Sequence, residues 1–381
     1  MKKNIFYIIL IALALKVIYL GFAVGVSKLN VGYSTGYTTN DFFSLFKRND
    51  SFWYQKAAEE GYPKITNEMD LGYSYGKYFK QSVWAHFPLY PLSIRMVETL
   101  CNLDFSRSAF IVSLVFSITS FIGFYLLCLS VFKLDERRSF FSTLFFMLFP
   151  FHYYYSMYYT EATFFTCLAF SFINISKKRY VTMSFWLIPL TLARPNGIVC
   201  LLPLFIYYIE VEGGFICFYN NIKNWDWPKI KNVLWFFSAP LALAVYCIYQ
   251  KYMTDHYFAY VKAQAGWYKE FMFPFLGLFR RGDLATQFNS VYTIVFMLMA
   301  IVMAKKIPLS LNILIWVSIL LPMTSGSVAC MPRYISAIFP FTIYMASFFV
   351  DRKRGILILP VLLLLQLLTF YPWLISDPFS Y

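Results

Sequence analysis

Long apolar runs recur along the whole chain, separated by short polar stretches. Many of them approach the roughly 20 residues that a helix needs to cross a bilayer, and several are shorter. We therefore expect an all-α polytopic membrane protein with about eleven transmembrane helices, some of them broken or re-entrant. The runs lie near 5–26, 108–132, 139–155, 159–176, 180–193, 196–211, 233–251, 288–304, 308–323, 334–350 and 355–374.

The first run could also be a signal peptide, because it follows Met1-Lys2-Lys3. Its apolar core is long and no clear small-residue cleavage site follows, which favours a retained helix.

Composition agrees with a membrane protein, since 59% of the 381 residues are hydrophobic and only 14% are charged. A soluble domain of this length could not cover so much apolar surface. We expect residues 1–381 to form a single transmembrane domain.

The formal net charge of +14 could indicate a nucleic-acid partner, but the positions of the basic residues do not support one. The basic clusters fall in alternate loops between the apolar runs, and the positive-inside rule makes those loops cytoplasmic. The N-terminus is then cytoplasmic, the C-terminus is extracytoplasmic, and no nucleic acid is expected as a partner. The clusters are Lys2-Lys3, Lys133 with Arg137-Arg138, Lys177-Lys178-Arg179, Lys223 with Lys229 and Lys231, Lys305-Lys306 and Arg352-Lys353-Arg354.

The long polar loops lie on the face opposite the basic clusters. Residues 27–107 form a large first extracytoplasmic loop, and residues 252–287 form a second one. Because structureless loops of such length are uncommon, we expect the first loop to contain short interfacial helices. We expect the chemically reactive side chains of the protein on this water-facing side.

Asp50 stands in the first loop, within Arg48-Asn49-Asp50-Ser51-Phe52-Trp53-Tyr54. The plain interpretation is a solvated acid or a helix cap. The aromatic residues that follow suit the membrane interface and would hold the acid close to lipid. Partial desolvation would raise its basicity, which is useful to a group that takes a proton from a hydroxyl. Asp50 is therefore a candidate general base.

Three further charged residues stand at the predicted outer ends of spans. Glu161 directly precedes an apolar run, where a carboxylate is costly unless the helix dipole or an arginine compensates it. Arg194 and Arg333 each lie beside a proline at a span end. Both could reach lipid headgroups by snorkelling. The positive-inside rule disfavours arginine on this face, however, so the pair indicates an anionic ligand such as a phosphate.

His86 lies in His86-Phe87-Pro88-Leu89-Tyr90-Pro91, and a single histidine of this kind is more often structural than a ligand. The chain has three histidines without ligand-like spacing. We therefore expect no obligatory metal or other cofactor, and the sequence offers no support for a divalent metal. The seven cysteines occur singly and indicate small buried apolar residues rather than redox chemistry.

Taken in order, these elements resemble the PIG-V family, the GPI mannosyltransferase 2 proteins and their prokaryotic relatives within the GT-C glycosyltransferases. The first-loop signature of that family is similar to the segment Asp50-Ser51-Phe52-Trp53-Tyr54 of this chain, with Ala57-Ala58 and Gly61-Tyr62 after it. The proline-rich element of the family is similar to Phe87-Pro88-Leu89-Tyr90-Pro91. Later elements are similar to Tyr159-Thr160-Glu161, to Arg194-Pro195-Asn196-Gly197 and to Phe258-Ala259-Tyr260 through Gln264 and Trp267. Asn49 departs from the pattern, because the family usually carries an aromatic residue there.

The resemblance implies a GT-C fold and an inverting glycosyltransferase. It would move a sugar, expected to be mannose, from a polyprenyl-phosphate donor to a hydroxyl of a lipid-linked or extracytoplasmic glycan acceptor, among membrane lipids. Asp50 would be the catalytic base, and Arg333, Arg194 or Lys262 would neutralise the leaving phosphate. The residues expected to bind donor or acceptor are Arg48, Trp53, Tyr54, His86, Glu161, Arg194, Asn196, Lys262, Gln264, Trp267, Arg333 and Tyr334. The expected location is a bacterial or archaeal plasma (inner) membrane, or the endoplasmic reticulum membrane in a eukaryote, with the site extracytoplasmic.

Two other functions are compatible with the same loops. A transporter or flippase of an anionic lipid-linked substrate would also have many spans and outer arginines. It should place ionisable residues near span centres and show repeated halves, whereas the unusual residues here concentrate on one face. A non-catalytic membrane subunit would tolerate Asp50→Asn, which an enzyme would not.

Overall fold

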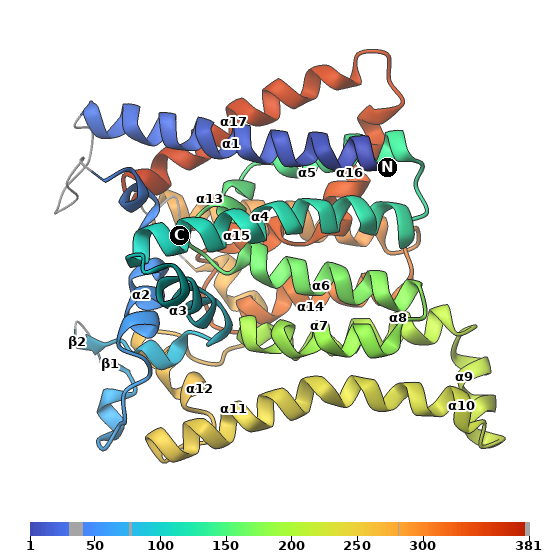
Figure 1. The fold of residues 1–381 in the computed structure, drawn as a ribbon, viewed down its shortest axis with the longest axis horizontal. Helices are drawn as coiled ribbons and strands as arrows, with labels where there is room; N and C mark the ends of the chain where they lie inside the picture. The colour runs from blue at the N-terminus through green and yellow to red at the C-terminus, as the bar shows by residue number, and fades with distance from the viewer. Residues whose placement is uncertain (30–40, 76–77, 281, 378–381) are drawn as a thin grey trace.

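The computed structural model describes residues 1–29, 41–75, 78–280 and 282–377, so 30–40 and 76–77 of the expected first loop lie outside the described residues. The described residues are mostly helical (Figure 1). The α-helices are α1 (Lys2–Lys28), α2 (Asp50–Glu59), α3 (Leu89–Cys101), α4 (Phe105–Ser130), α5 (Glu136–Leu148), α6 (Glu161–Ser176), α7 (Tyr180–Ala193), α8 (Leu201–Val211), α9 (Phe215–Lys223), α10 (Trp227–Ile230), α11 (Ser238–Thr254), α12 (Ala259–Ala263), α13 (Leu284–Met303), α14 (Leu309–Met323), α15 (Met331–Ser336), α16 (Phe339–Val350) and α17 (Ile358–Leu374). The 3₁₀ turns are η1 (Phe42–Phe46), η2 (Glu68–Asp70), η3 (Val83–Ala85), η4 (His152–Ser156), η5 (Pro195–Gly197), η6 (Lys231–Phe237), η7 (Gln264–Trp267), η8 (Pro274–Phe279) and η9 (Gly355–Leu357). The strands β1 (Tyr73–Tyr75) and β2 (Tyr78–Lys80) pair antiparallel, with Ser74 opposite Phe79.

Among the described residues, five helices are long and apolar enough to cross a membrane, or six if the bent pair Pro195–Val211 and Phe215–Lys223 is one span. The five are Lys2–Lys28, Phe105–Ser130, Trp227–Thr254, Leu284–Met303 and Gly355–Leu374. Other apolar helices, including α6, α7, α14 and α16, are shorter. The chain therefore has the helical architecture of a membrane protein, while the expected number of eleven spans stays a prediction.

The apolar run 139–155 does not continue as one helix. Instead, α5 ends at Leu148, and η4 follows after a turn. Phe149 has an extended ψ of 141°, because the ring of Pro150 disfavours the helical region for the residue before it. The chain then passes through the buried aromatic residues of η4 towards Glu161. The first loop does contain short helices, as expected, in α2 and α3.

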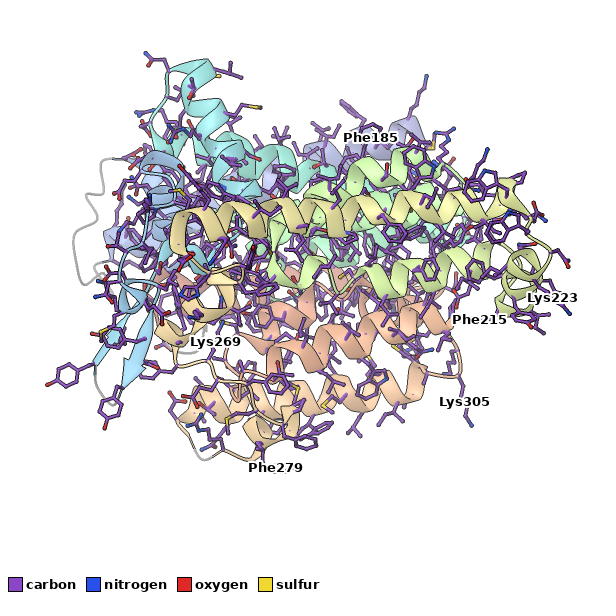
Figure 2. The ribbon with its side chains drawn as sticks, turned by 90° about the horizontal axis from the view of Figure 1, so that it is seen from below. Phe185, Phe215, Lys223, Lys269, Phe279 and Lys305 are labelled. Carbon is purple, nitrogen blue, oxygen red and sulfur yellow. The ribbon has the colours of Figure 1, made fainter. Side chains whose placement is uncertain are left out.

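The two ends of the helical bundle differ in kind. Figure 1 draws α2, α3, α12 and both strands at one end of the long helices, which we call the loop-rich end, with α9 and α10 at the other. Figure 2 labels Lys223 and Lys305 close to this second end. The N-terminal amine pairs with Glu136, and Arg138 pairs with Asp351. Basic segments that the sequence assigns to one side thus lie together, and the side of the membrane that they face stays a prediction.

Helix α4 packs against α1, α3, α5 and α6. Its buried positions include the small hydroxyl side chains Ser108, Ser113, Ser117 and Ser120. Small residues let helices approach closely where lipid supplies no hydrophobic drive between them. Large apolar side chains such as Val17 on α1 remain exposed on α1, α11, α13 and α17, as expected for helices that face lipid.

Candidate functional site

Four charged side chains from distant parts of the sequence form a continuous ion chain. The Arg333 guanidinium donates from Nη1 to Asp50 Oδ2 at 2.9 Å, and from Nε to Glu161 Oε1. Arg194 Nη1 donates to the same Glu161 oxygen at 2.9 Å. Charges alternate along Asp50, Arg333, Glu161 and Arg194, so the ion chain is neutral as a whole. Each buried charge therefore has the compensation that burial requires.

Local backbone conformation places Asp50 at the start of α2. Asn49 has a φ of 48°, in the left-handed region that asparagine tolerates better than most residues. Asp50 follows in the first turn of the helix, where the helix dipole favours a carboxylate. The turn gives a physical reason for asparagine at position 49.

Glu161 and Arg194 lie at the ends of neighbouring helices. Glu161 is the first residue of α6, and its side chain is 0% exposed. Either the helix dipole or an arginine was expected to compensate this carboxylate. The structure shows two arginines at hydrogen-bond distance from it. Arg194 follows α7 in an extended conformation, because Pro195 comes next. The predicted pairing of Glu161 with an arginine is thereby confirmed, and the side of the membrane on which the pair lies stays a prediction.

Arg333 is held on several sides. It follows Pro332 in the first turn of α15. Its guanidinium carbon lies 4.4 Å from the ring centre of Tyr159 and 5.1 Å from that of Tyr154. A cation over aromatic faces is attracted by their negative quadrupole. Two rings and two carboxylates therefore determine the position of this guanidinium.

Asp50 is the member of the ion chain that solvent reaches most, with a side chain 30% exposed against 8% for Arg333. Burial raises the pKa of the Asp50 carboxyl, but the charge and hydrogen bond of Arg333, with a further contribution from Lys269, outweigh burial and lower that pKa below its usual value. The expectation that desolvation makes Asp50 more basic is therefore wrong for this structure. A cation at hydrogen-bond distance acts on the carboxylate more strongly than partial burial does.

Aromatic side chains from both large loops form a wall beside Asp50. The ring of His86 stacks on Trp53 with centres 5.9 Å apart, and Trp267 lies edge-on to each at 5.5 Å. Tyr54 packs edge-on against His86 at 5.3 Å. Burial lowers the pKa of His86 to about 4, so its ring is neutral at pH 7. These four residues, the aromatic wall, bring apolar ring surface and polar ring edges together beside Asp50, and such rings suit contact with a ring-shaped ligand.

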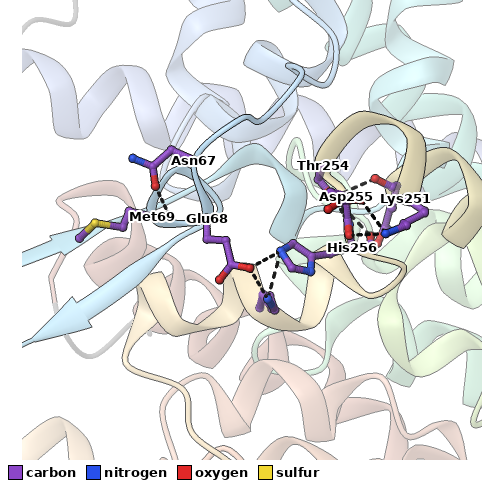
Figure 3. Close-up of polar contacts among 9 residues, drawn as sticks. Asn67, Glu68, Met69, Lys251, Thr254, Asp255 and His256 are labelled. Atoms are coloured by element: carbon purple, nitrogen blue, oxygen red, sulfur yellow. Dashed lines mark hydrogen bonds and ion pairs between the residues drawn. The ribbon is translucent and has the colours of Figure 1, made fainter.

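Lys262 belongs to a separate surface cluster with Glu68 and His256, the two members that Figure 3 labels. Its Nζ lies 3.4 Å from Glu68 Oε1 and 3.1 Å from His256 Nε2, and the same Glu68 oxygen lies 2.9 Å from His256. The cluster joins the second loop to the first. Across the ranges that the structure describes, no hydrogen bond or ion pair joins Lys262 to Asp50 or Arg333. Its expected role at the leaving phosphate has no support in this geometry.

Gln264 and Arg48 make supporting contacts. Gln264 Nε2 donates to the Ala85 carbonyl at 3.4 Å, which links the second loop to the segment before the aromatic wall. Arg48 is buried next to α2, and its backbone carbonyl accepts from the Tyr159 hydroxyl at 3.3 Å. Both contacts position the backbone that carries the site. The two remaining candidates, Asn196 and Tyr334, line a cavity with Arg194.

Two lysines with contacts relevant to function were not predicted from the sequence. Lys269 is exposed in the loop after η7, and its charge lowers the pKa of Asp50. No sequence motif singles it out. Lys16 lies within α1 at 2% exposure and donates to Ser113 Oγ at 2.8 Å and to the Ser156 carbonyl. It is the only charged residue of the apolar run 5–26, and that isolation was a usable signal.

The site thus combines an accessible carboxylate, two arginines and the aromatic wall at the loop-rich end. Across residues 1–29, 41–75, 78–280 and 282–377, no group of three His, Cys, Asp or Glu side chains could hold a metal ion. A scan against models of known protein families finds none that matches this chain, and a search of curated proteins finds no match.

Proposed function

We propose that the protein is an inverting glycosyltransferase with a GT-C architecture, similar to the PIG-V family, which uses a polyprenyl-phosphate sugar as donor. The observation that supports this most is Asp50, an accessible carboxylate beside the aromatic wall of an apolar helical protein. Mannose is the proposed sugar, and a hydroxyl of a lipid-linked or other extracytoplasmic acceptor is the proposed nucleophile. The proposed location is a bacterial or archaeal plasma membrane, with Asp50 on the outer face.

In this mechanism the acceptor oxygen forms a bond to C1 of the sugar while the bond from C1 to the phosphate oxygen breaks, which inverts the anomeric centre. Asp50 takes the proton of the acceptor hydroxyl. The polyprenyl phosphate leaves as an anion, and Arg194 or Arg333 stabilises its charge. Because both substrates are held in one membrane, proximity contributes to the rate.

The ion pair with Arg333 has two consequences for a base. It orients the Asp50 carboxylate, and it lowers the affinity of that carboxylate for a proton. A weak base suffices if the proton moves after the new carbon–oxygen bond has begun to form, since the acceptor hydroxyl is then much more acidic. The aromatic wall would meanwhile hold the flat face of the sugar.

The direct test compares glycosyl transfer by purified wild type and Asp50→Asn, with a panel of polyprenyl-phosphate sugars and a membrane extract as the acceptor source. General base catalysis contributes about 10²–10⁴-fold, so Asp50→Asn should lose nearly all transfer and still bind donor. Asp70→Asn is the matched control, because Asp70 is another acid of the first loop that pairs with Lys80 at the surface. Equal transfer by wild type and Asp50→Asn would refute the proposed function.

A flippase or transporter of an anionic lipid is the second candidate, and Lys16 favours it. An ionisable residue buried within a membrane-spanning helix is expected along a substrate or ion pathway. The Lys16 ammonium lies 5.0 Å from the ring centre of Phe46 and 4.8 Å from that of Phe110. It donates to a hydroxyl and a carbonyl, and within the described residues no carboxylate forms an ion pair with it. Proteoliposomes would separate the two functions, because a flippase should move a fluorescent lipid between leaflets and a transferase should not.

A further inference from the structure

At the end of the bundle opposite the loop-rich end, the chain turns sharply between α8 and α9. The helical stretch Pro195–Val211 and the helix Phe215–Lys223 are bent by 83° relative to each other. The bend lies at Gly213 and Gly214, which have φ angles of 104° and 89°, values that residues with a side chain rarely adopt. Two consecutive glycines therefore build the bend into the backbone, and α8 and α9 do not form one straight span.

Helix α9 is too short to cross a bilayer by itself. Its nine residues, at about 1.5 Å each, make a helix of about 14 Å, which is about half of the hydrocarbon core. Figure 1 draws α9 and α10 next to the ends of α8 and α11, and Figure 2 labels Phe215 and Lys223 at the same end of the bundle. A short apolar helix that turns away from the preceding helix at this end has the placement of a helix in the membrane surface.

Helix α9 has two different faces. On one face Phe218 packs edge-on against Phe205 of α8, with ring centres 5.8 Å apart. The other face is apolar and exposed, and the exposed fraction of Ile216 reaches 79%. Its positions recur with the spacing of a helix, so the side chains form one stripe. The members of this stripe are Phe215, Ile216, Tyr219 and Ile222.

Two tryptophans extend the apolar stripe towards α11. The rings of Trp225 and Trp227 lie 6.5 Å apart in a nearly parallel arrangement, and both side chains are exposed. Tryptophan is enriched where a membrane meets water, because its ring is apolar and its N–H is polar. A contiguous exposed apolar patch of this kind indicates a surface that contacts something other than water.

The charges of the same segment indicate what it contacts. Residues 215–231 contain three lysines and one aspartate. Lys229 pairs with Asp226 at 2.9 Å, whereas no carboxylate of the described residues lies at ion-pair distance from Lys223 or Lys231. Lysines beside an apolar stripe suit anionic lipid headgroups, which their long stems reach while the stripe stays in lipid. A protein partner is less suited, because lysine is depleted in the core of protein interfaces.

We propose that residues 215–231 form an interfacial anchor that lies in one membrane leaflet and binds anionic phospholipid. The apolar stripe and the two tryptophans enter the boundary between headgroups and acyl chains. Lys223 and Lys231 contact the headgroup phosphates. Because the anchor joins α8 to α11, it holds the ends of both helices at the level of the headgroups. This proposal needs the helices to lie in a membrane but does not depend on glycosyl transfer.

The test measures quenching of Trp225 and Trp227 by brominated lipids in nanodiscs that contain the purified full chain. The fluorescence of this pair is the difference between wild type and the variant Trp225→Phe/Trp227→Phe. Brominated phosphatidylglycerol and brominated phosphatidylcholine are compared at the same small fraction of a phosphatidylcholine bilayer. We expect the anionic lipid to quench with an apparent affinity about fivefold higher or more, because two lysines attract it.

The lysines are tested by the double variant Lys223→Gln/Lys231→Gln. It should reduce the preference for phosphatidylglycerol to about twofold or less, because the charges that attract the anionic headgroup are removed. Lys28→Gln/Lys64→Gln is the charge-matched control. Both of these lysines are exposed, and they belong to the end of α1 and to the first loop, so the preference should stay as in wild type.

The apolar stripe is tested by Ile216→Ser/Ile222→Ser. Both side chains are exposed, so the packing of Phe218 on α8 is retained while the stripe loses its attraction to lipid. Quenching by both lipids should fall to about half or less, since the buried apolar area determines how strongly such a helix inserts. Asn220→Ser is the control on the same helix, because Asn220 is exposed and polar, and it should leave quenching unchanged.

Equal quenching of wild type by the two lipids, or a full preference in Lys223→Gln/Lys231→Gln, would overturn the binding of anionic lipid. Absence of quenching by either lipid would overturn the anchor and assign the apolar stripe to a protein partner. A preference that is lost in phosphate buffer, but not in sodium chloride of equal ionic strength, would identify a site for free phosphate and overturn the headgroup contact. Because no sugar donor or acceptor is present, each of these results is independent of whether the protein is a glycosyltransferase.

Discussion

Replacing Arg333 with glutamine removes the cation that joins two carboxylates. In the wild type its guanidinium donates to both Asp50 and Glu161. After the substitution, Glu161 remains buried and depends on Arg194 alone. Asp50 lies at the solvent-accessible end of the ion chain and regains water. We expect Arg333→Gln to lower stability and to release Asp50 from its ion pair.

Loss of the ion pair with Glu161 costs more stability than loss of the ion pair with Asp50. Removing one partner of a buried ion pair costs about 3–5 kcal/mol, because the remaining charge stays buried. Arg194 still compensates Glu161, so the cost at Glu161 falls at the lower end of this range. Asp50 is partly exposed to water, so the loss of its ion pair costs about 1 kcal/mol or less. The expected total destabilisation is about 3–4 kcal/mol.

Thermal unfolding can be followed through cysteines that become reactive as the protein opens. Cys128, Cys167 and Cys200 are among the buried cysteines, and a thiol-reactive dye would report their exposure. At pH 7 the melting temperature of Arg333→Gln should fall by about 5 °C. Arg107→Gln is the matched control, because Arg107 belongs to an exposed surface pair and should change the melting temperature by about 1 °C or less.

The pH dependence provides an independent check. Because Arg333 lowers the folded-state pKa of Asp50, the ion pair stabilises the protein above the unfolded pKa, near about 4. That stability is lost as the pH falls through the folded pKa. Wild type should therefore lose more stability than Arg333→Gln on acidification below about pH 4. A variant that melts like wild type at pH 7 and shows the same acid sensitivity would refute the ion chain.

His86→Phe should preserve the aromatic wall and remove an acid-sensitive group. Because burial lowers the folded-state pKa of His86 to about 4, wild type should lose stability as the pH falls from about 6.5 towards that value, and thermal unfolding should show a smaller loss in the variant. Lys262→Gln should leave glycosyl transfer within about twofold of wild type, because Lys262 pairs with Glu68 at an exposed surface; a large loss would assign it to the phosphate after all. Lys16→Met should keep or slightly raise the melting temperature, since methionine removes a buried charge, and transfer should persist. Loss of lipid translocation in Lys16→Met proteoliposomes, with transfer absent throughout, would instead favour the flippase.

The candidate site could be predicted as a set of residues but not as an arrangement. Asp50, Glu161, Arg194 and Arg333 each stand at a predicted outer end of an apolar segment, where ionisable groups are tolerated. Their order of pairing could not be predicted, because Asp50 and Arg333 are 283 residues apart and no periodicity relates them. Lys262 was also expected at the phosphate, because the sequence does not show which residues lie close together in space. In the structure it lies in the surface cluster instead.

The sequence by itself determined that this is a helical membrane protein with its unusual charged residues at helix ends. The partition of a segment between lipid and water depends mainly on its own composition, so this level needs no tertiary contacts. Only the tertiary structure decided how basic Asp50 is. Its aromatic surroundings favoured a raised pKa, but Arg333 at 2.9 Å lowers it. Electrostatic interactions depend on distance in space, and a cation brought to hydrogen-bond distance by the fold outweighs partial burial.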